Sequence, residues 1–236
     1  MRRVPVYIIN LERQPEKKLM FKKLNKWVPN KKFVKAFDAS KEPLPPHNQE
    51  KDGRYGCFMS HVDIWQKVVN GKDEWVIVAE DDANIFKPLK HDWNSIIEAM
   101  KTEGADVGLL SWRKPSKDSK IPEQGSGDKL RLEKVDSVFW GTHLYIMNKN
   151  GAKRMLEEYD PAGPTPVDLL MAQKSETGEV PVYFIVGSKP YGANFEGFGS
   201  TTEKMEGTGT CWALWAGIAF AVVVFFIYLY IRSRRR

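Results

Sequence analysis

The stretch EWVIVAEDDA, residues 74–83, carries the strongest structural signal in the chain. Its five apolar residues at 75–79 follow one another without a polar gap, which indicates a strand buried on both faces, as in the parallel sheet of an α/β protein. Glu80, Asp81 and Asp82 follow at once. The carboxyl end of such a strand usually faces the ligand crevice. Because neighbouring carboxylates repel and a divalent cation relieves that repulsion, the stretch predicts either a metal and nucleotide-diphosphate site or a solvated acidic turn.

Strands and helices are expected to alternate along the rest of the chain. β-branched and aromatic residues predict strands, and apolar residues at helical spacing predict helices. We expect strands over 4–10, 32–37, 106–112, 135–140, 142–148 and 180–186, and helices over 13–27, 92–101, 151–159 and 167–174. Residues 114–129 are rich in Ser, Gly, Pro and Lys and predict a mobile loop. The alternation favours an α/β layered fold with a mostly parallel mixed sheet.

A second informative stretch is DGRYGCFMSHVDIWQKVVNG, residues 52–71. Ser60 is expected to cap a helix whose third position holds Asp63. Cys57 and His61 then lie near the start of the helix, where backbone amides favour an anion. For His61 the alternative is a buried histidine whose hydrogen bonds are satisfied within the fold.

Most of the net positive charge lies at the C-terminal end of the sequence. The formal net charge is +6, but without Arg232, Arg234, Arg235 and Arg236 there remain 32 basic against 30 acidic side chains. The basic excess therefore does not indicate a nucleic-acid partner. Two cysteines, Cys57 and Cys211, far apart in sequence, imply neither a disulfide framework nor a zinc cluster.

Residues 212–231 are twenty residues without charge, and we expect them to form a transmembrane helix. The N-terminus lacks the features of a signal peptide. We therefore expect a single-pass, C-terminally anchored membrane protein with its catalytic domain in the cytosol, although the arginine tail favours the reverse orientation by the positive-inside bias. The expected organisation is a catalytic domain over 1–190, a linker over 191–211, the membrane helix over 212–231 and a basic tail over 232–236.

Five separated motifs occur in one order, and their spacing carries a family resemblance. They are VYIINLER at 6–13, YGCFMSHVDIW at 55–65, VIVAEDDA at 76–83, GTHLYIMNKNGAKRM at 141–155 and PVD at 166–168. Together they resemble glycosyltransferase family 25, which includes lipooligosaccharide-biosynthesis proteins and procollagen galactosyltransferases. The resemblance covers residues 4–190.

The resemblance implies a GT-A type fold that binds a nucleotide-sugar, often UDP-galactose, and transfers a hexose (galactose or glucose) with inversion to a hydroxyl of a glycan or protein. It also implies a divalent metal, Mn²⁺ or Mg²⁺. The family's Asp-x-Asp signature corresponds to Glu80-Asp81-Asp82, with Asp82 and Glu80 as expected metal ligands and Glu80 or Asp81 as contacts to ribose or metal-bound water.

The same resemblance suggests roles for residues outside the signature. Asn10 and Arg13 are expected to hold the nucleotide base or ribose, the alternative being a surface turn. Ser60 and Thr142 lie in matched motifs and are expected to contact the donor, although Thr142 belongs to a strand whose residues more often pack than bind. His61 is expected to have a catalytic role, the alternative being that it orients a backbone segment. Asp168 is the expected base for the acceptor hydroxyl, the alternative being a helix first-turn charge.

Two other functions fit the sequence less well. Acids with a metal also serve nucleotidyltransferases, but we find no glycine-rich basic loop of that type. A catalytically inactive, tail-anchored scaffold that retains the fold for binding is the alternative outside enzymes.

Overall fold

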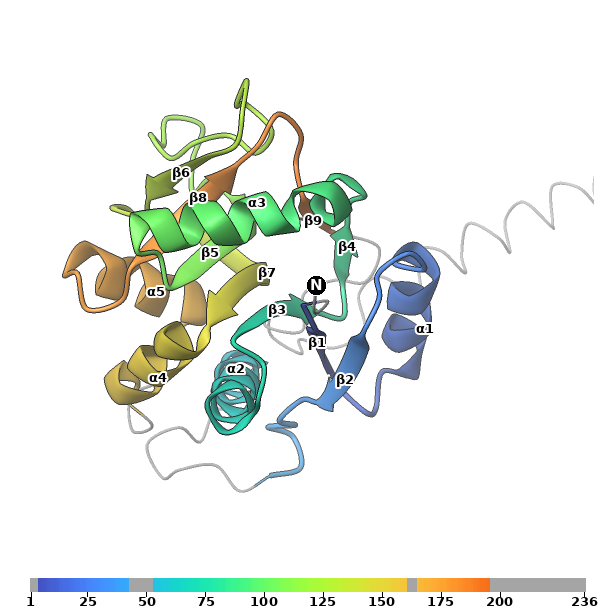
Figure 1. The fold of residues 1–236 in the computed structure, drawn as a ribbon. Coiled ribbons are helices and arrows are strands. Elements are labelled where there is room, and N and C mark those ends of the chain that lie inside the picture. The colour runs from blue at the N-terminus through green and yellow to red at the C-terminus, as the bar shows by residue number, and fades with distance from the viewer. Residues whose placement is uncertain (1–3, 43–52, 161–164, 196–236) are drawn as a thin grey trace, which may run out of the picture. The chain divides into compact units, whose positions relative to one another are not determined.

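The computed structural model describes residues 4–42, 53–160 and 165–195, which form one mixed α/β unit (Figure 1). Seven strands form the main sheet, and two short strands form a second sheet. The strands of the main sheet, in spatial order, are β2 (Lys31–Lys35), β1 (Val6–Asn10), β3 (Trp75–Glu80), β7 (Trp140–Asn148), β5 (Val107–Arg113), β8 (Val182–Val186) and β6 (Arg131–Lys134). The second sheet pairs β4 (Ala83–Ile85) with β9 (Gly192–Asn194).

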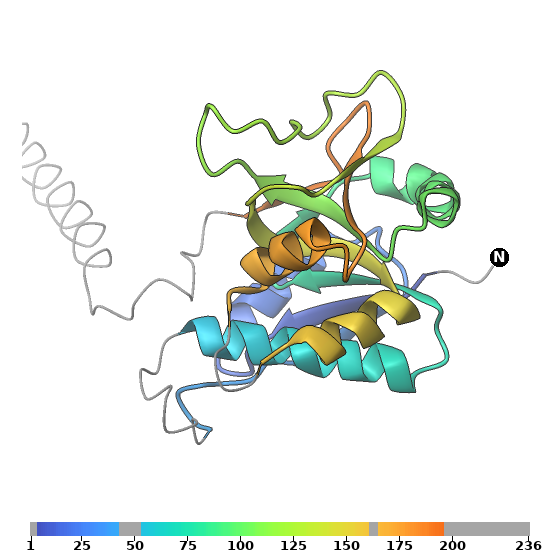
Figure 2. The same cartoon turned by 90° about the vertical axis from the view of Figure 1, so that its left-hand side faces the viewer.

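Five helices cover the two faces of the main sheet. They are α1 (Pro15–Leu24), α2 (Gly53–Asn70), α3 (Pro88–Glu103), α4 (Lys149–Glu158) and α5 (Val167–Glu176). Figures 1 and 2 show α2 and α4 side by side along one face, with α3 on the other. Buried side chains of α2, α4 and α5 share one apolar core, and those of α1 and α3 share a second. The sheet is thus the middle of three layers.

Strand β3 is buried on both faces, as its unbroken apolar run predicts. Val76 and Val78 belong to the core beneath α2, whereas Ile77 and Ala79 belong to the core beneath α3. Side chains alternate between the faces of a strand, so an apolar residue at every position is required only where both faces are covered.

The main sheet is mixed, with five of its seven strands running in one direction and two in the other. Strand β1 runs parallel to β2 and β3, and β5 runs parallel to β8, but β7 is antiparallel to both of its neighbours and β6 is antiparallel to β8. Parallel neighbours need a crossover connection, usually a helix. No helix separates β5 from β6, and β6 runs opposite to β5.

Two local expectations are wrong. Of the strands expected over 135–140 and 142–148, the first is absent, because residues 135–139 form no strand, and the second is part of β7, which begins at Trp140 and passes through Gly141 at φ +88°. Ser60 does not cap a helix, because α2 already includes Gly53 and Ser60 lies well inside it. Tyr55 and Phe58 are buried, and this apolar face extends the helix toward its N-terminus. Cys57 and His61 therefore lie within the helix and not at its amino end.

The membrane helix included in the expected fold is not supported. Among residues 4–42, 53–160 and 165–195, no helix is both long enough and apolar enough to span a bilayer. The longest of these, α2, carries Arg54, Asp63 and Lys67. The segments expected as linker, membrane helix and basic tail fall outside the described residues, apart from 191–195. The fold class is corrected by removing the membrane helix, and the mixed α/β sheet fits a GT-A-like arrangement.

Asn25 connects the end of α1 to β4, the strand that follows the acidic residues. It is completely buried, its Nδ2 donates to the Ala83 carbonyl at 3.0 Å, and its Oδ1 accepts from the Ile85 amide at 2.7 Å. The side chain thereby fixes the position of β4 behind the acidic turn.

We expect Asn25→Ala to lower the free energy of unfolding by about 2–4 kcal/mol, because two buried backbone groups lose their partner. Denaturant titration measures this change. Asn70→Ala, at an exposed position on α2, is the control and should change stability by less than about 0.5 kcal/mol. Equal effects of the two substitutions would contradict the assigned role of Asn25.

Candidate active site

The acidic residues lie at the carboxyl end of β3, in the middle of the sheet. Glu80 is the last residue of β3, and Asp81 and Asp82 form the turn into β4. Because β1 is parallel to β3, with Ile9 paired to Glu80, Asn10 at the end of β1 lies beside this turn. We call the ends of β1 and β3 and the turn 81–82 the carboxyl edge.

The antiparallel direction of β7 brings a further segment to the carboxyl edge. Ala79 near the end of β3 pairs with Leu144 near the start of β7. Gly141, Thr142 and His143 therefore lie toward this edge, whereas a parallel β7 would have placed them at the other end of the sheet.

Asp81 is held by two neighbours inside the fold. Its Oδ2 accepts a hydrogen bond from Asn10 Nδ2 at 2.7 Å, and its Oδ1 lies 3.9 Å from Lys17 Nζ. Burial raises the pKa of Asp81, although Asn10 and Lys17 oppose that rise. Asp81 is thus tied to β1 and α1.

Lys17 is a residue of this edge that the sequence analysis did not identify. It is only 4% exposed and lies near all three acids, lowering the pKa of each. The only sequence signal is its spacing, because Lys17 lies four residues before the buried Phe21 and so shares its helix face.

Asp82 differs from Asp81 in lacking a partner for one oxygen. Its Oδ1 is buried and makes no hydrogen bond within the described part of the chain. Burial, together with repulsion from Glu80 and Asp81, raises the pKa of Asp82 to about 7. A buried carboxylate oxygen without a donor is a position that a hard cation satisfies, so the residues fit the divalent metal implied by the sequence.

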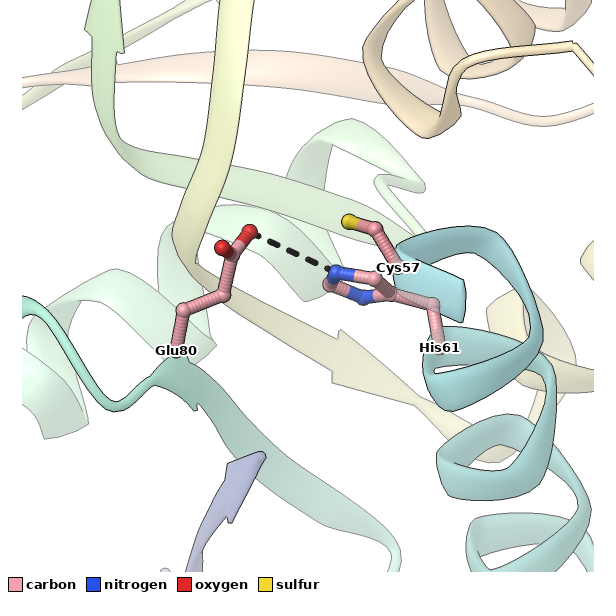
Figure 3. Close-up of side chains that lie close together, drawn as sticks. All are labelled: Cys57, His61 and Glu80. Carbon is pink, nitrogen blue, oxygen red and sulfur yellow. Dashed lines mark ion pairs between the residues drawn. The ribbon is translucent and has the colours of Figure 1, made fainter. Parts of the chain in front are cut away.

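Glu80 faces His61 and Cys57, which lie one turn apart on α2 (Figure 3). One ligand atom from each of these three residues lies within 4.8 Å of the other two. His61 Nε2 is 3.5 Å from Glu80 Oε1, a long contact for a hydrogen bond. Burial opposes ionisation of Glu80, yet contact with His61 and the nearby charges of His143 and Lys17 lower its pKa.

Asp168 also lies near this cluster, because its charge acts on the Cys57 thiol. Burial raises the pKa of the Cys57 thiol well above its ordinary value, and the negative charges of Glu80, Asp168 and Asp82 raise it further. The site thus brings together acids from the end of β3 and from the first turn of α5.

Asp168 is fixed against the start of β7. Its Oδ2 accepts from the Gly141 amide at 2.9 Å, and its Oδ1 accepts from the Leu169 amide at 2.9 Å. Gly141 has the left-handed φ noted above, and a Cβ there would lie 2.8 Å from His143 Nδ1. Glycine is therefore required at the residue that holds Asp168.

The other expected site residues make mainly structural contacts. Ser60 Oγ accepts from the Phe37 amide at 2.9 Å and donates to the Gly56 carbonyl at 2.6 Å. Arg13 Nε donates to Asp38 Oδ2 at 3.1 Å, with about a third of the arginine side chain exposed. Thr142 is buried in β7. Their roles in binding remain predictions.

His143 is a second residue that the sequence analysis missed. It is buried, and its Nε2 lies 2.8 Å from Ser111 Oγ. Burial lowers its pKa, and Arg113 lowers it further, while Glu80 opposes the shift. The sequence signal for His143 is the GTH motif, in which Thr142 is the expected site residue.

Comparison with known proteins agrees with the resemblance found in the sequence. The family model described as glycosyltransferase family 25 (LPS biosynthesis protein) matches residues 3–171. The chain belongs to glycosyltransferase family 25. The resemblance inferred from the five motifs is confirmed, and every expected site residue lies within the matched range.

Curated relatives include both animal and bacterial proteins. A glycosyltransferase 25 family member of Aedes aegypti is 29% identical over 69% of this chain and 29% of its own length. Procollagen galactosyltransferase 2 of Mus musculus is 25% identical over 76% of this chain and 32% of its own. The lipooligosaccharide biosynthesis protein lex-1 of Haemophilus influenzae is 30% identical over 47% of this chain and 40% of its own. The matched region thus spans less than half the length of each of these relatives.

The raised pKa of Asp82 predicts a pH-dependent cost to stability in the absence of metal. Because the folded-state pKa lies above the unfolded value, the folded chain binds the proton more tightly, and stability falls as pH rises from about 4 to about 7. We expect Asp82→Asn to stabilise the chain, and its advantage in unfolding free energy to grow by about 1–3 kcal/mol between pH 5 and pH 8.

Denaturant titrations of both proteins with a chelator present measure this difference. Asp118→Asn, at an exposed position, is the matched control and should show no such growth. An advantage of Asp82→Asn that is the same at both pH values would contradict the raised pKa.

Proposed function

We propose that the chain transfers a hexose, galactose or glucose, from a UDP-sugar to a hydroxyl group of a glycan or protein acceptor, with inversion and with the help of a divalent cation. The observation that carries the proposal is the buried, unpartnered Oδ1 of Asp82 beside Glu80 at the carboxyl edge of a family 25 chain. The names of the mouse and Haemophilus relatives support galactose as the sugar and a protein or glycan as the acceptor.

Asp82 and Glu80 are the proposed holders of Mn²⁺ or Mg²⁺. Their oxygens suit hard cations, whereas the Cys57 thiol and the His61 imidazole suit softer metals. When bound, such a cation neutralises the negative charge that develops on the diphosphate leaving group.

The chain's own residues prepare the edge for the donor. Lys17 supplies a fixed positive charge near the three acids, which reduces the repulsion that an incoming diphosphate meets. Asn10 acts through Asp81, which it holds at 2.7 Å. Arg13 is partly exposed and has further guanidinium donors to offer to the ribose or base.

Asp168 is the proposed base. As the acceptor oxygen forms its bond to the anomeric carbon, its proton passes to the Asp168 carboxylate, and the bond from the anomeric carbon to the diphosphate oxygen breaks with UDP leaving on the opposite face. The amides of Gly141 and Leu169 hold both carboxylate oxygens in place, and each oxygen retains a second lone pair for the incoming proton.

Two substitutions separate donor binding from transfer. We expect Asp168→Asn to keep UDP-sugar binding and to lower the transfer rate by about 10²–10⁴-fold, because the amide oxygen still accepts from Gly141 but cannot take the proton. Asp82→Asn should weaken metal-dependent donor binding by at least about 10-fold.

Calorimetry with UDP-hexoses and Mn²⁺ measures binding, and UDP release in the presence of acceptor measures transfer. Asp118→Asn should behave as the unmodified chain. A chain that binds no UDP-hexose with any divalent cation would contradict the proposal and support a scaffold. Undiminished transfer by Asp168→Asn would remove it from the role of base.

A further inference from the structure

Three buried side chains form a series of hydrogen bonds that leads to Glu80. Trp65 Nε1 donates to Tyr145 Oη at 3.0 Å, and Tyr145 Oη lies 2.9 Å from His61 Nδ1. His61 then presents Nε2 to Glu80 Oε1 at 3.5 Å. Trp65, Tyr145 and His61 are all 0% exposed, so water does not compete for these contacts.

The donor and the acceptor in each of these hydrogen bonds follow from the groups available. The indole N–H of tryptophan can only donate, so Tyr145 Oη accepts from Trp65. The hydroxyl proton of Tyr145 then needs an acceptor, and among the described residues His61 Nδ1 is the one in contact. His61 Nδ1 therefore accepts, and the proton of the neutral imidazole is left on Nε2.

The opposite arrangement leaves a buried proton without a partner. With the proton on Nδ1, His61 would donate to Tyr145 Oη, which would then accept two hydrogen bonds while its own O–H found no acceptor. Unpaired buried donors are strongly disfavoured. Trp65 thus influences the tautomer of His61 through the hydroxyl of Tyr145.

A proton on His61 Nε2 would face a carboxylate oxygen of Glu80. The Nε2 atom is buried and makes no hydrogen bond of good geometry in the described ranges, and the oxygen it faces belongs to Glu80 (Figure 3). A neutral N–H directed at a carboxylate supports the charged form of that carboxylate and fixes its orientation.

We propose that Trp65 and Tyr145 fix the proton of His61 on Nε2, so that His61 is a positioning residue that holds Glu80 as a hydrogen-bond donor. It is then neither the base nor a metal ligand. The importance of Glu80 rests on the proposed function, but the position of the proton does not.

The cluster of Cys57, His61 and Glu80 offers a competing arrangement. A cation bound there would need the lone pair of Nε2, which forces the proton to Nδ1 and leaves the Tyr145 hydroxyl unpaired. The two arrangements therefore differ in one observable, the nitrogen of His61 that carries the proton.

Nitrogen-15 NMR of the full chain labelled at histidine measures this directly. The chain has four histidines, and the loss of one set of signals in His61→Gln assigns His61. We expect a protonated Nε2 and an unprotonated Nδ1. Protonation at Nδ1, or at both nitrogens near neutral pH, would overturn the proposal.

Two variants test what sets the tautomer. Tyr145→Phe removes the donor to Nδ1, and Trp65→Phe frees Tyr145 Oη to accept from His61, so either change should convert the single tautomer into a mixture. Tyr183→Phe is the control, because Tyr183 lies on β8 and takes no part in these hydrogen bonds, and it should leave the His61 signals unchanged. A single Nε2 tautomer in both folded variants would overturn the role of the Trp65–Tyr145 pair.

Rescue by substitution separates positioning from other roles. The Gln amide reaches as far as Nε2 and can still donate to Glu80, whereas the Asn amide reaches only as far as Nδ1. We expect His61→Asn to weaken metal-dependent UDP-sugar binding by about 10–100-fold and His61→Gln to recover most of that loss. Equal losses in the two variants would overturn the positioning role, and an absence of binding in the unmodified chain would refute the proposed function while leaving the NMR result intact.

Discussion

The structure of the site depends on how three adjacent carboxylates are kept close together at the end of a buried strand. Each one has a different environment. Asp81 is bound by Asn10 and lies near Lys17, Glu80 faces His61, and Asp82 keeps one buried oxygen without a partner. Their pKa values are accordingly shifted in different directions. This division leaves a pair of acids available to a cation while the third secures the turn.

The other elements of the fold bring their side chains to this turn. Strand β1 runs parallel to β3 and delivers Asn10, α2 delivers His61 and Cys57, and α1 delivers Lys17. The antiparallel β7 brings Gly141 to the same edge, and Gly141 in turn holds Asp168. The reversed strand is therefore what joins the acid on α5 to the acids after β3, and a sheet with only parallel strands would separate them.

The features that could be predicted from the sequence are those determined by residues close together in it. The doubly buried β3 follows from five apolar residues in a row, and the proximity of Asn10 follows from the shared edge of parallel strands. The direction of β7 and the burial of Lys17 depend on contacts between distant segments, which residue patterns do not encode. Ser60 followed by Asp63 has the pattern of a helix start, but buried Tyr55 and Phe58 extend the helix beyond it. Tertiary packing outweighed the local signal there.

The proposed activity requires a cation and a nucleotide diphosphate to bind at the carboxyl edge through Asp82 and Glu80. Crystals grown with Mn²⁺ and UDP test it most directly, because anomalous scattering locates manganese without assumptions about its ligands. We expect one manganese peak in contact with the Asp82 and Glu80 carboxylates and with the diphosphate of UDP. Manganese bound by Cys57 and His61, or UDP bound away from the carboxyl edge, would contradict it.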